Sequence, residues 1–186
     1  MRAFVAVEID EECRSALLGA VDALKRAADG VRWVRPEQMH VTLKFIGEID
    51  DLDVADAIGC IRPAAERAEP FTMHLAGLSA FPPRGKPRVI HVEAEDASGK
   101  LHELHDNVED ALARELGVER ENRRYIPHIT LGRVKNRGAC PPMEEISAAL
   151  PEQDFGRVDV DSFVLMQSDL QPIGAVYTVV HRFELD

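Results

Sequence analysis

The chain contains MHVTLKFIG at residues 39–47 and PHITLGRV at residues 127–134, so the pattern His, apolar residue, Thr, Leu occurs twice. Both stretches alternate polar with apolar residues and are rich in β-branched side chains, which predicts two β-strands of similar design. A pattern that returns in this way indicates an approximate internal duplication, in which each half of the chain supplies one such strand.

Alternation along a strand determines which side chains of the two motifs share a face. His40 and Thr42 fall on one face of the first strand, and His128 and Thr130 fall on one face of the second. The apolar residues between them are expected to anchor each strand in the hydrophobic core. Two lobes that face each other across these strands would bring the four polar side chains together in one groove.

The other segments predict helices and strands in much the same order around each motif. Apolar spacing predicts helices that begin at Asp10, near residues 50–53 and at Ser98, and a short helix near residues 143–150. Pro63 is expected to kink or end the second helix. Further strands are expected at residues 2–8, 31–34, 71–78, 88–94, 157–167 and 175–184. We therefore predict an α+β fold in one bilobal domain over residues 1–186, with two antiparallel sheets flanked by helices around a central groove.

Composition narrows the classes of function. The 186 residues are 45% hydrophobic, enough for one substantial core. The formal charge of −11 argues against a protein that coats long stretches of nucleic acid, although it leaves room for a local basic pocket that binds one phosphate. The three cysteines form no Cys-x-x-Cys pair, so neither a disulfide framework nor a zinc site is expected. No apolar stretch reaches membrane-spanning length, and we expect a cytoplasmic protein without membrane contact.

The repeated residues suit a particular chemistry. Two imidazoles that face each other can remove one proton and deliver another near neutral pH, as in-line displacement at phosphorus requires. The threonine hydroxyls can donate hydrogen bonds to the non-bridging phosphate oxygens as charge builds on them. A single His-x-Thr on a strand is more often structural, and it is the doubling that favours a catalytic pair acting on a phosphodiester.

The sequence also resembles the two-histidine (2H) phosphoesterase superfamily, and within it the RNA 2′,3′-cyclic phosphodiesterases, which are also called 2′-5′ RNA ligases. The resemblance covers both motifs and residues 2–7, 33–47, 81–82, 87–89, 127–133, 165–168 and 174–177. It implies hydrolysis of a terminal 2′,3′-cyclic phosphate to a 2′-phosphomonoester without metal or other cofactor. By this resemblance His40 is the proton donor to the leaving 3′ oxygen, and His128 is the proton acceptor that activates water. In ligation, a 5′-hydroxyl takes the place of that water.

Two basic residues are further candidates for substrate binding. Arg133 matches an arginine of the family and could bind phosphate, but strict alternation places it opposite His128, so a bend or a long reach is needed. Lys44 falls on the same face as His40 and Thr42, where it could contact substrate or remain a solvated lysine.

Two more positions complete the predicted groove. Tyr125 ends a basic run at residues 120–124 that could steer an RNA end, or could simply form a polar loop. Relatives often carry tryptophan on the strand that follows residues 87–89, whereas this chain has His91, which we interpret as a surface residue.

Two alternatives to this enzyme remain open. A non-catalytic RNA-end or nucleotide-binding module would keep the groove without the reaction, although arginine would serve phosphate binding better than paired His-x-Thr motifs. A small-molecule cyclic nucleotide phosphodiesterase would use the same four residues. We expect a monomer whose partners are RNA ends that bear a 2′,3′-cyclic phosphate.

Overall fold

The computed structural model describes residues 1–172 and 174–186. Along the chain the elements are β1 (Arg2–Glu8), α1 (Glu11–Lys25), β2 (Val31–Trp33), a 3₁₀ turn (Pro36–Gln38), β3 (His40–Glu48), a second 3₁₀ turn (Asp51–Asp53), α2 (Val54–Glu66), β4 (Phe71–Phe81), β5 (Val89–Glu95), α3 (Lys100–Leu116), β6 (His128–Val134), α4 (Met143–Ala148), β7 (Asp154–Val160), β8 (Ser162–Gln171) and β9 (Gly174–Glu184). The expected α+β class with antiparallel pairing is confirmed.

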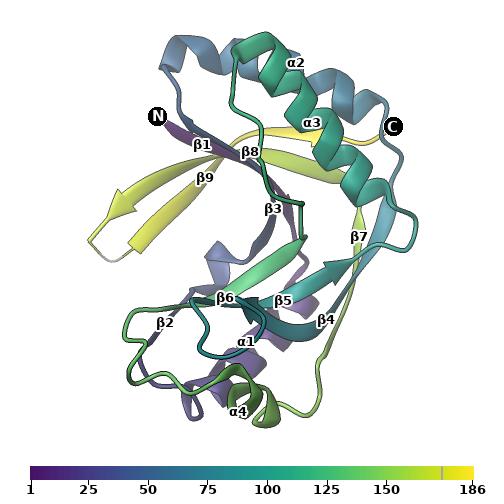
Figure 1. The fold of residues 1–186 in the computed structure, drawn as a ribbon. Helices are drawn as coiled ribbons and strands as arrows, with labels where there is room; N and C mark the ends of the chain where they lie inside the picture. Colours follow the sequence, from purple (N-terminus) through teal and green to yellow (C-terminus); the bar gives the residue numbers. More distant parts are fainter. Residues whose placement is uncertain (173) are drawn as a thin grey trace.

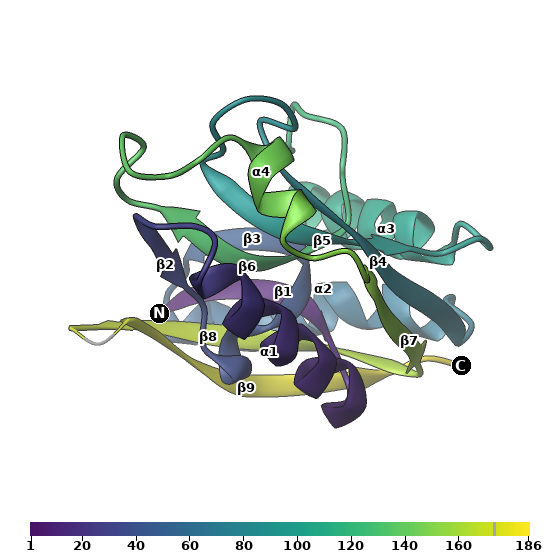
Figure 2. The ribbon, with the colours of Figure 1, turned by 90° about the horizontal axis from the view of Figure 1, so that it is seen from below.

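The strands form one sheet in the order β7-β4-β5-β6-β3-β1-β8-β9, with β2 paired to β6. The two sheets expected from the sequence are therefore halves of a single curled sheet. They join where β3 and β6 pair at Val41 and Ile129, so the two motif strands lie side by side at the centre. Figure 1 shows α2 and α3 together at one end of the molecule and α1 and α4 at the other. In Figure 2 the β8–β9 hairpin runs along one border of the molecule.

Helix ends follow the local sequence, with two differences from expectation. The Asp10 side chain caps α1 by accepting a 2.8 Å hydrogen bond from the Cys13 amide, as predicted. The predicted cap of α3 at Ser98 is wrong, because Gly99 is the capping position and the Asp96 carboxylate accepts the Leu101 amide at 2.9 Å. Pro63 does not stop α2, which continues to Glu66, because a proline in the last turn removes only one backbone donor.

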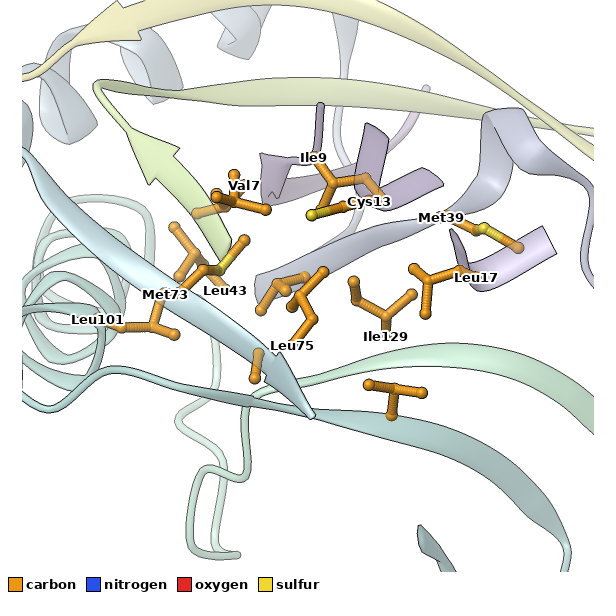
Figure 3. Packing of buried hydrophobic residues seen from close by; sticks show 14 of the residues in the cluster. Val7, Ile9, Cys13, Leu17, Met39, Leu43, Met73, Leu75, Leu101 and Ile129 are labelled. Atoms are coloured by element: carbon orange, nitrogen blue, oxygen red, sulfur yellow. The ribbon is translucent and has the colours of Figure 1, made fainter. Parts of the chain in front are cut away.

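One face of the sheet packs on the helices and forms the main core. Figure 3 shows side chains of β1, α1, β3, β4 and β6 converging there, with Leu43 and Ile129 contributed by the two motif strands. The opposite face carries a small separate cluster that includes Phe4 and Met166, with Tyr177 packed against it. The apolar residues of the motifs thus anchor both strands in the core and leave their polar residues on the other face.

Candidate active site

The pairing of β3 with β6 brings the four repeated residues together. Because the strands are antiparallel with Val41 opposite Ile129, His40 lies beside Thr130 and Thr42 lies beside His128. All four line one cavity of about 220 Å³. The structure therefore places the two imidazoles and the two hydroxyls on a common floor, as alternation along the strands predicts.

The walls of this cavity come from segments that the sequence motifs do not include. Residues that line it beyond the central four are Arg32, Trp33, Val34, Arg35, Gln38, Phe45, Arg133, Lys135, Gly174, Ala175 and Tyr177. Four of them are cationic, although the chain as a whole carries a net charge of −11. The cavity is thus a local basic site on an acidic protein, suited to a bound anion.

His128 is held as a neutral imidazole whose proton is on Nδ1. Its Nδ1 lies 2.7 Å from the carbonyl oxygen of Ile126, so Nδ1–H donates there and Nε2 keeps its lone pair. Burial lowers the pKa of His128 and the Arg133 guanidinium lowers it further, while the Ile126 carbonyl opposes the shift. A neutral imidazole with a fixed tautomer is what a proton acceptor needs at neutral pH.

His40 lies deeper and is enclosed by aromatic rings. The ring centroids of Phe4 and Tyr177 lie 4.9 and 5.3 Å from that of His40. Burial lowers the pKa of His40 to about 4, with smaller contributions in the same direction from His128 and Arg14. Without an anion beside it His40 is therefore neutral at pH 7, and a bound phosphate would favour its protonated form.

A third histidine lies against this pair. His91 is only 1% exposed, so its interpretation as a surface residue is wrong. It stands opposite Thr130 on β5, a strand flanked on both sides, and its ring lies 4.3 Å from that of Phe81 and 4.8 Å from that of His128. Neither ring nitrogen has a hydrogen-bond partner among the described residues, and burial lowers the pKa of His91 to about 4.

A β-bulge in β6 explains how Arg133 enters the cavity. Against β5, Gly132 pairs with Ile90 and Thr130 pairs with His91, so Leu131 is an extra residue that shifts the alternation by one. Arg133 thereby returns to the face of His128, from which strict alternation excludes it. The bulge supplies the bend that Arg133 needs to reach the face of His128.

A matching bulge in β3 has the opposite consequence for Lys44. Against β1, Val5 pairs with Lys44 and Ala6 pairs with Thr42, so Leu43 is the extra residue. After this shift Lys44 turns away from the cavity and the following residue, Phe45, lines it instead. The expectation that Lys44 shares the face of Thr42 is wrong, because alternation fails at the bulge.

The family model for the 2′-5′ RNA ligase superfamily matches residues 13–172. This chain belongs to that family. It is 33% identical to the RNA 2′,3′-cyclic phosphodiesterase of Archaeoglobus fulgidus, over 99% of this chain and 100% of the relative. It is 35% identical to the enzyme of the same name from Thermus thermophilus, over 100% of this chain and 90% of the relative.

Two solved structures share the fold of this chain. The crystal structure of TT0787 of Thermus thermophilus matches with a TM-score of 0.82 and 31% identity, over 100% of this chain and 98% of the other. Escherichia coli LigT in complex with 3′-AMP matches with a TM-score of 0.78 and 24% identity, over 99% of this chain and 97% of the other.

In this member of the family, Lys44 supports the site from behind. Its Nζ lies 2.7 Å from Glu109 Oε1 on α3 and donates a second 2.7 Å hydrogen bond to the carbonyl of Glu119. The Lys44 side chain is 1% exposed. Lys44 does not line the cavity of the histidines and is not solvated, and its ammonium group ties β3 to α3 and to the following loop.

Tyr125 likewise lies outside the cavity that holds the histidines. Its hydroxyl donates a 2.9 Å hydrogen bond to the backbone carbonyl of Thr42, and its ring stacks on His105 at 3.8 Å. Burial raises the pKa of the Tyr125 hydroxyl. Tyr125 therefore positions the backbone of β3, and the prediction that it contacts substrate in the cavity is not supported by its placement.

Sequence reasoning missed several residues that line the cavity. Arg32, Arg35 and Tyr177 reach it through β2, the first 3₁₀ turn and β9. The two arginines lie within eight positions of His40, a cluster of cations that could have been noticed.

Among the described residues no group of three or more His, Cys, Asp or Glu could hold a metal ion. No helix in that part of the chain is long and apolar enough to cross a membrane.

Proposed function

We propose that this chain is an RNA 2′,3′-cyclic phosphodiesterase that converts a terminal cyclic phosphate into a 2′-phosphomonoester. The observation that carries the proposal is the placement of His40 and His128 on adjacent strands in one basic cavity, each beside the threonine of the other motif. Relatives named for this activity cover the whole length of the chain, which supports the same assignment.

Each residue of the motif pair has one task in the proposed mechanism. His128 accepts a proton from water through Nε2, and the water oxygen attacks phosphorus. The bond between phosphorus and the 3′ oxygen breaks on the opposite side, and His40 donates the proton that the leaving oxygen needs. Thr42, Thr130 and Arg133 hydrogen-bond the non-bridging oxygens, where negative charge increases in the transition state.

The protonation states follow from the charge of the substrate. The phosphodiester anion raises the pKa of His40, because it stabilises the imidazolium beside it. His128 is the better base because the Ile126 carbonyl already holds its Nδ1 proton and leaves Nε2 free to accept another. Substrate binding thus prepares the acid while leaving the base neutral.

The cavity also favours RNA over a small cyclic nucleotide. Beyond the central four residues it carries Arg32, Arg35, Arg133 and Lys135, more positive charge than one phosphate requires. We propose that the excess binds the backbone phosphates of an RNA end. We further propose a monomer that acts in the cytoplasm, where a reducing environment keeps cysteines as thiols; Cys13, Cys60 and Cys140 are free.

The decisive experiment uses a short RNA that ends in a 2′,3′-cyclic phosphate, incubated with the protein in EDTA. We expect full turnover to a 2′-phosphate, and a roughly 10²-fold or larger loss in His40→Ala and in His128→Ala. Replacement of the exposed His102 by alanine is the control and should leave turnover unchanged. Loss of activity in EDTA that a divalent metal restores would overturn the metal-independent mechanism, and binding without turnover would favour the non-catalytic module.

A second substrate assigns the two roles. Sulfur in place of the leaving 3′ oxygen needs no proton, so this substrate should restore the rate of His40→Ala selectively. If this substrate instead restores the rate of His128→Ala, His128 is the acid and His40 is the base. The double variant should lose less than the product of the two single losses, because both residues act in one transition state.

A further inference from the structure

Two stretches of the chain hold no acidic residue, and the fold brings them side by side. Residues 71–92 and 122–143 contain eight lysines or arginines and no aspartate or glutamate, although the whole chain has 33 acidic and 22 basic residues. The strands β5 and β6, which belong largely to these stretches, pair with Val89 opposite Arg133 and His91 opposite Thr130. One region of an acidic protein is therefore strongly positive.

The positive charge gathers in the loop before β5 and the loop after β6. Lys86 Nζ donates a 3.0 Å hydrogen bond to the Arg137 carbonyl, and Arg137 Nη2 donates one of 3.3 Å to the Lys86 carbonyl, so the two loops are tied together. In Figure 1 the loop after β6 runs toward α4, at the end of the molecule away from α2 and α3. Five cationic side chains of these loops are exposed, and none of them forms an ion pair with a described residue. We call them the basic rim, which consists of Arg84, Lys86, Arg88, Lys135 and Arg137.

Backbone hydrogen bonds hold both loops in place. The amides of Lys135 and Asn136 donate hydrogen bonds of 2.8 and 3.1 Å to the Gly30 carbonyl. Gly30 permits this approach, because a Cβ there would lie 2.5 Å from the Asn136 carbonyl oxygen. On the other loop, the Gly85 carbonyl accepts the Met143 amide at 3.0 Å. The basic rim is thus carried by fixed backbones, which lowers the entropic cost of binding a ligand.

The charge of the basic rim indicates what kind of ligand it binds. Like charges gathered on one surface repel one another, and this repulsion opposes folding unless a bound anion relieves it. The chain has 33 acidic residues that could have neutralised these cations, yet the two stretches that carry the rim contain none. Five cations are more than one phosphate requires, and their spread over two loops fits the successive phosphates of a nucleic-acid backbone.

The basic rim begins at the catalytic cavity. Lys135 lines that cavity together with Arg133, which precedes it by two residues. Arg137 lies two residues further along the chain and outside the cavity, with Lys86 beside it. On the opposite wall, the described residues that β9 contributes to the cavity include no cation. A strand whose 3′ end lies in the cavity can therefore continue across the rim with its phosphates beside successive cations.

We propose that the basic rim binds the backbone of the RNA upstream of the cyclic phosphate, so that the protein acts on strands of several nucleotides in preference to a dinucleotide. This inference rests on the proposed function, which places the cyclic phosphate beside His40 and His128. The rim touches only phosphates that do not react, so it changes how well the substrate binds and leaves the proton transfers to the two histidines. Because backbone contacts carry no sequence information, the preference is for length and not for sequence.

The test compares two substrates that differ in length, a dinucleotide and a single strand of about twelve nucleotides, both ending in a 2′,3′-cyclic phosphate. Wild-type protein should have a kcat/KM about tenfold or more higher for the longer strand. In Lys86→Glu/Arg137→Glu this advantage should disappear, while kcat/KM for the dinucleotide changes less than about twofold. The salt dependence of kcat/KM for the longer strand should also weaken, by roughly 0.7 in the log–log slope for each lost phosphate contact.

Binding is measured in parallel, by fluorescence anisotropy of the longer product with its 2′-phosphate, so that the basic rim is tested independently of turnover. The double variant should bind this product about tenfold or more weakly than wild type. Arg62→Glu/Arg67→Glu is the matched control, because it reverses two exposed charges on and just after α2, at the other end of the molecule (Figure 1). The control should leave both substrates and the binding unchanged.

Equal kcat/KM for the two lengths in wild-type protein would overturn the proposal and leave the proposed function intact. Turnover of neither substrate, with binding that the double variant still weakens, would contradict the proposed function and retain the basic rim. An equal loss on both substrates in the double variant would show that the two loops shape the cavity instead. If the double variant abolishes only a salt-sensitive self-association seen by sedimentation, the rim binds the acidic surface of a second copy and the proposal is wrong.

Discussion

Replacement of His91 by phenylalanine should stabilise the protein. His91 is 1% exposed, packs against the rings of Phe81 and His128, and has no hydrogen-bond partner for either ring nitrogen among the described residues. A buried polar atom without a partner costs roughly 1–3 kcal/mol, and phenylalanine keeps a ring of similar shape without that cost. We therefore expect His91→Phe to raise the free energy of unfolding at pH 7 by about 1–3 kcal/mol.

The same substitution should change how stability depends on pH. The pKa of His91 is lowered from its ordinary value of 6.5 to about 4, so between these values the unfolded chain binds a proton that the folded protein excludes. Stability from this group is therefore full above pH 6.5 and is lost as pH falls toward 4. Linkage gives a loss of roughly 2 kcal/mol between pH 7 and pH 5 that His91→Phe should not show. His40, whose pKa is shifted in the same direction, contributes its own acid loss to both proteins.

Urea unfolding at pH 7 and at pH 5 measures both effects, since the transition midpoint multiplied by the slope gives the free energy of unfolding. His102→Phe, at an exposed position on α3, is the matched control and should change neither value appreciably. A loss of stability in His91→Phe at pH 7 would show that the ring nitrogens are hydrogen-bonded in solution. If the stability of the variant and that of the wild type fall equally between pH 7 and pH 5, the inference that folding prevents protonation of His91 is refuted.

Three further predictions concern the site and its support. Gly132→Ala should destabilise the protein by about 1–3 kcal/mol in the same unfolding assay, because the added Cβ would lie 2.9 Å from the Trp33 ring. It should also weaken substrate binding, because Arg133 follows directly in the chain. Unchanged stability would contradict this packing. Lys44→Met should lower the free energy of unfolding by about 3–5 kcal/mol, because it leaves the Glu109 carboxylate unpaired. The kcat of the protein that remains folded should change little. A loss of kcat without a loss of stability would show that Lys44 contacts the substrate. The alkaline limb of the pH profile should lie at higher pH for kcat than for kcat/KM. The pKa of His40 is lowered to about 4 in the free protein, and a bound phosphate raises the pKa of His40 in the complex. If the two alkaline limbs coincide, His40 is not the acid.

Much of this protein could be predicted from local sequence. The repeated His-x-Thr pattern placed His40, Thr42, His128 and Thr130 on strands with their apolar neighbours in the core, and the structure brings these four into one cavity. Such a prediction works because the side chains of an undistorted strand alternate strictly between its two faces. Helix positions followed from apolar spacing in the same way, within a few residues at their ends.

The tertiary structure decided what alternation could not. The bulges at Leu43 and Leu131 exist only in the register of each strand against its neighbour, and they turn Lys44 away from the cavity and Arg133 into it. The burial of His91 likewise depends on Phe81, which reaches it across the pairing of β4 with β5. A strand's own residues specify which side chains alternate, but the partner strands determine where the alternation slips and which of its polar groups are covered.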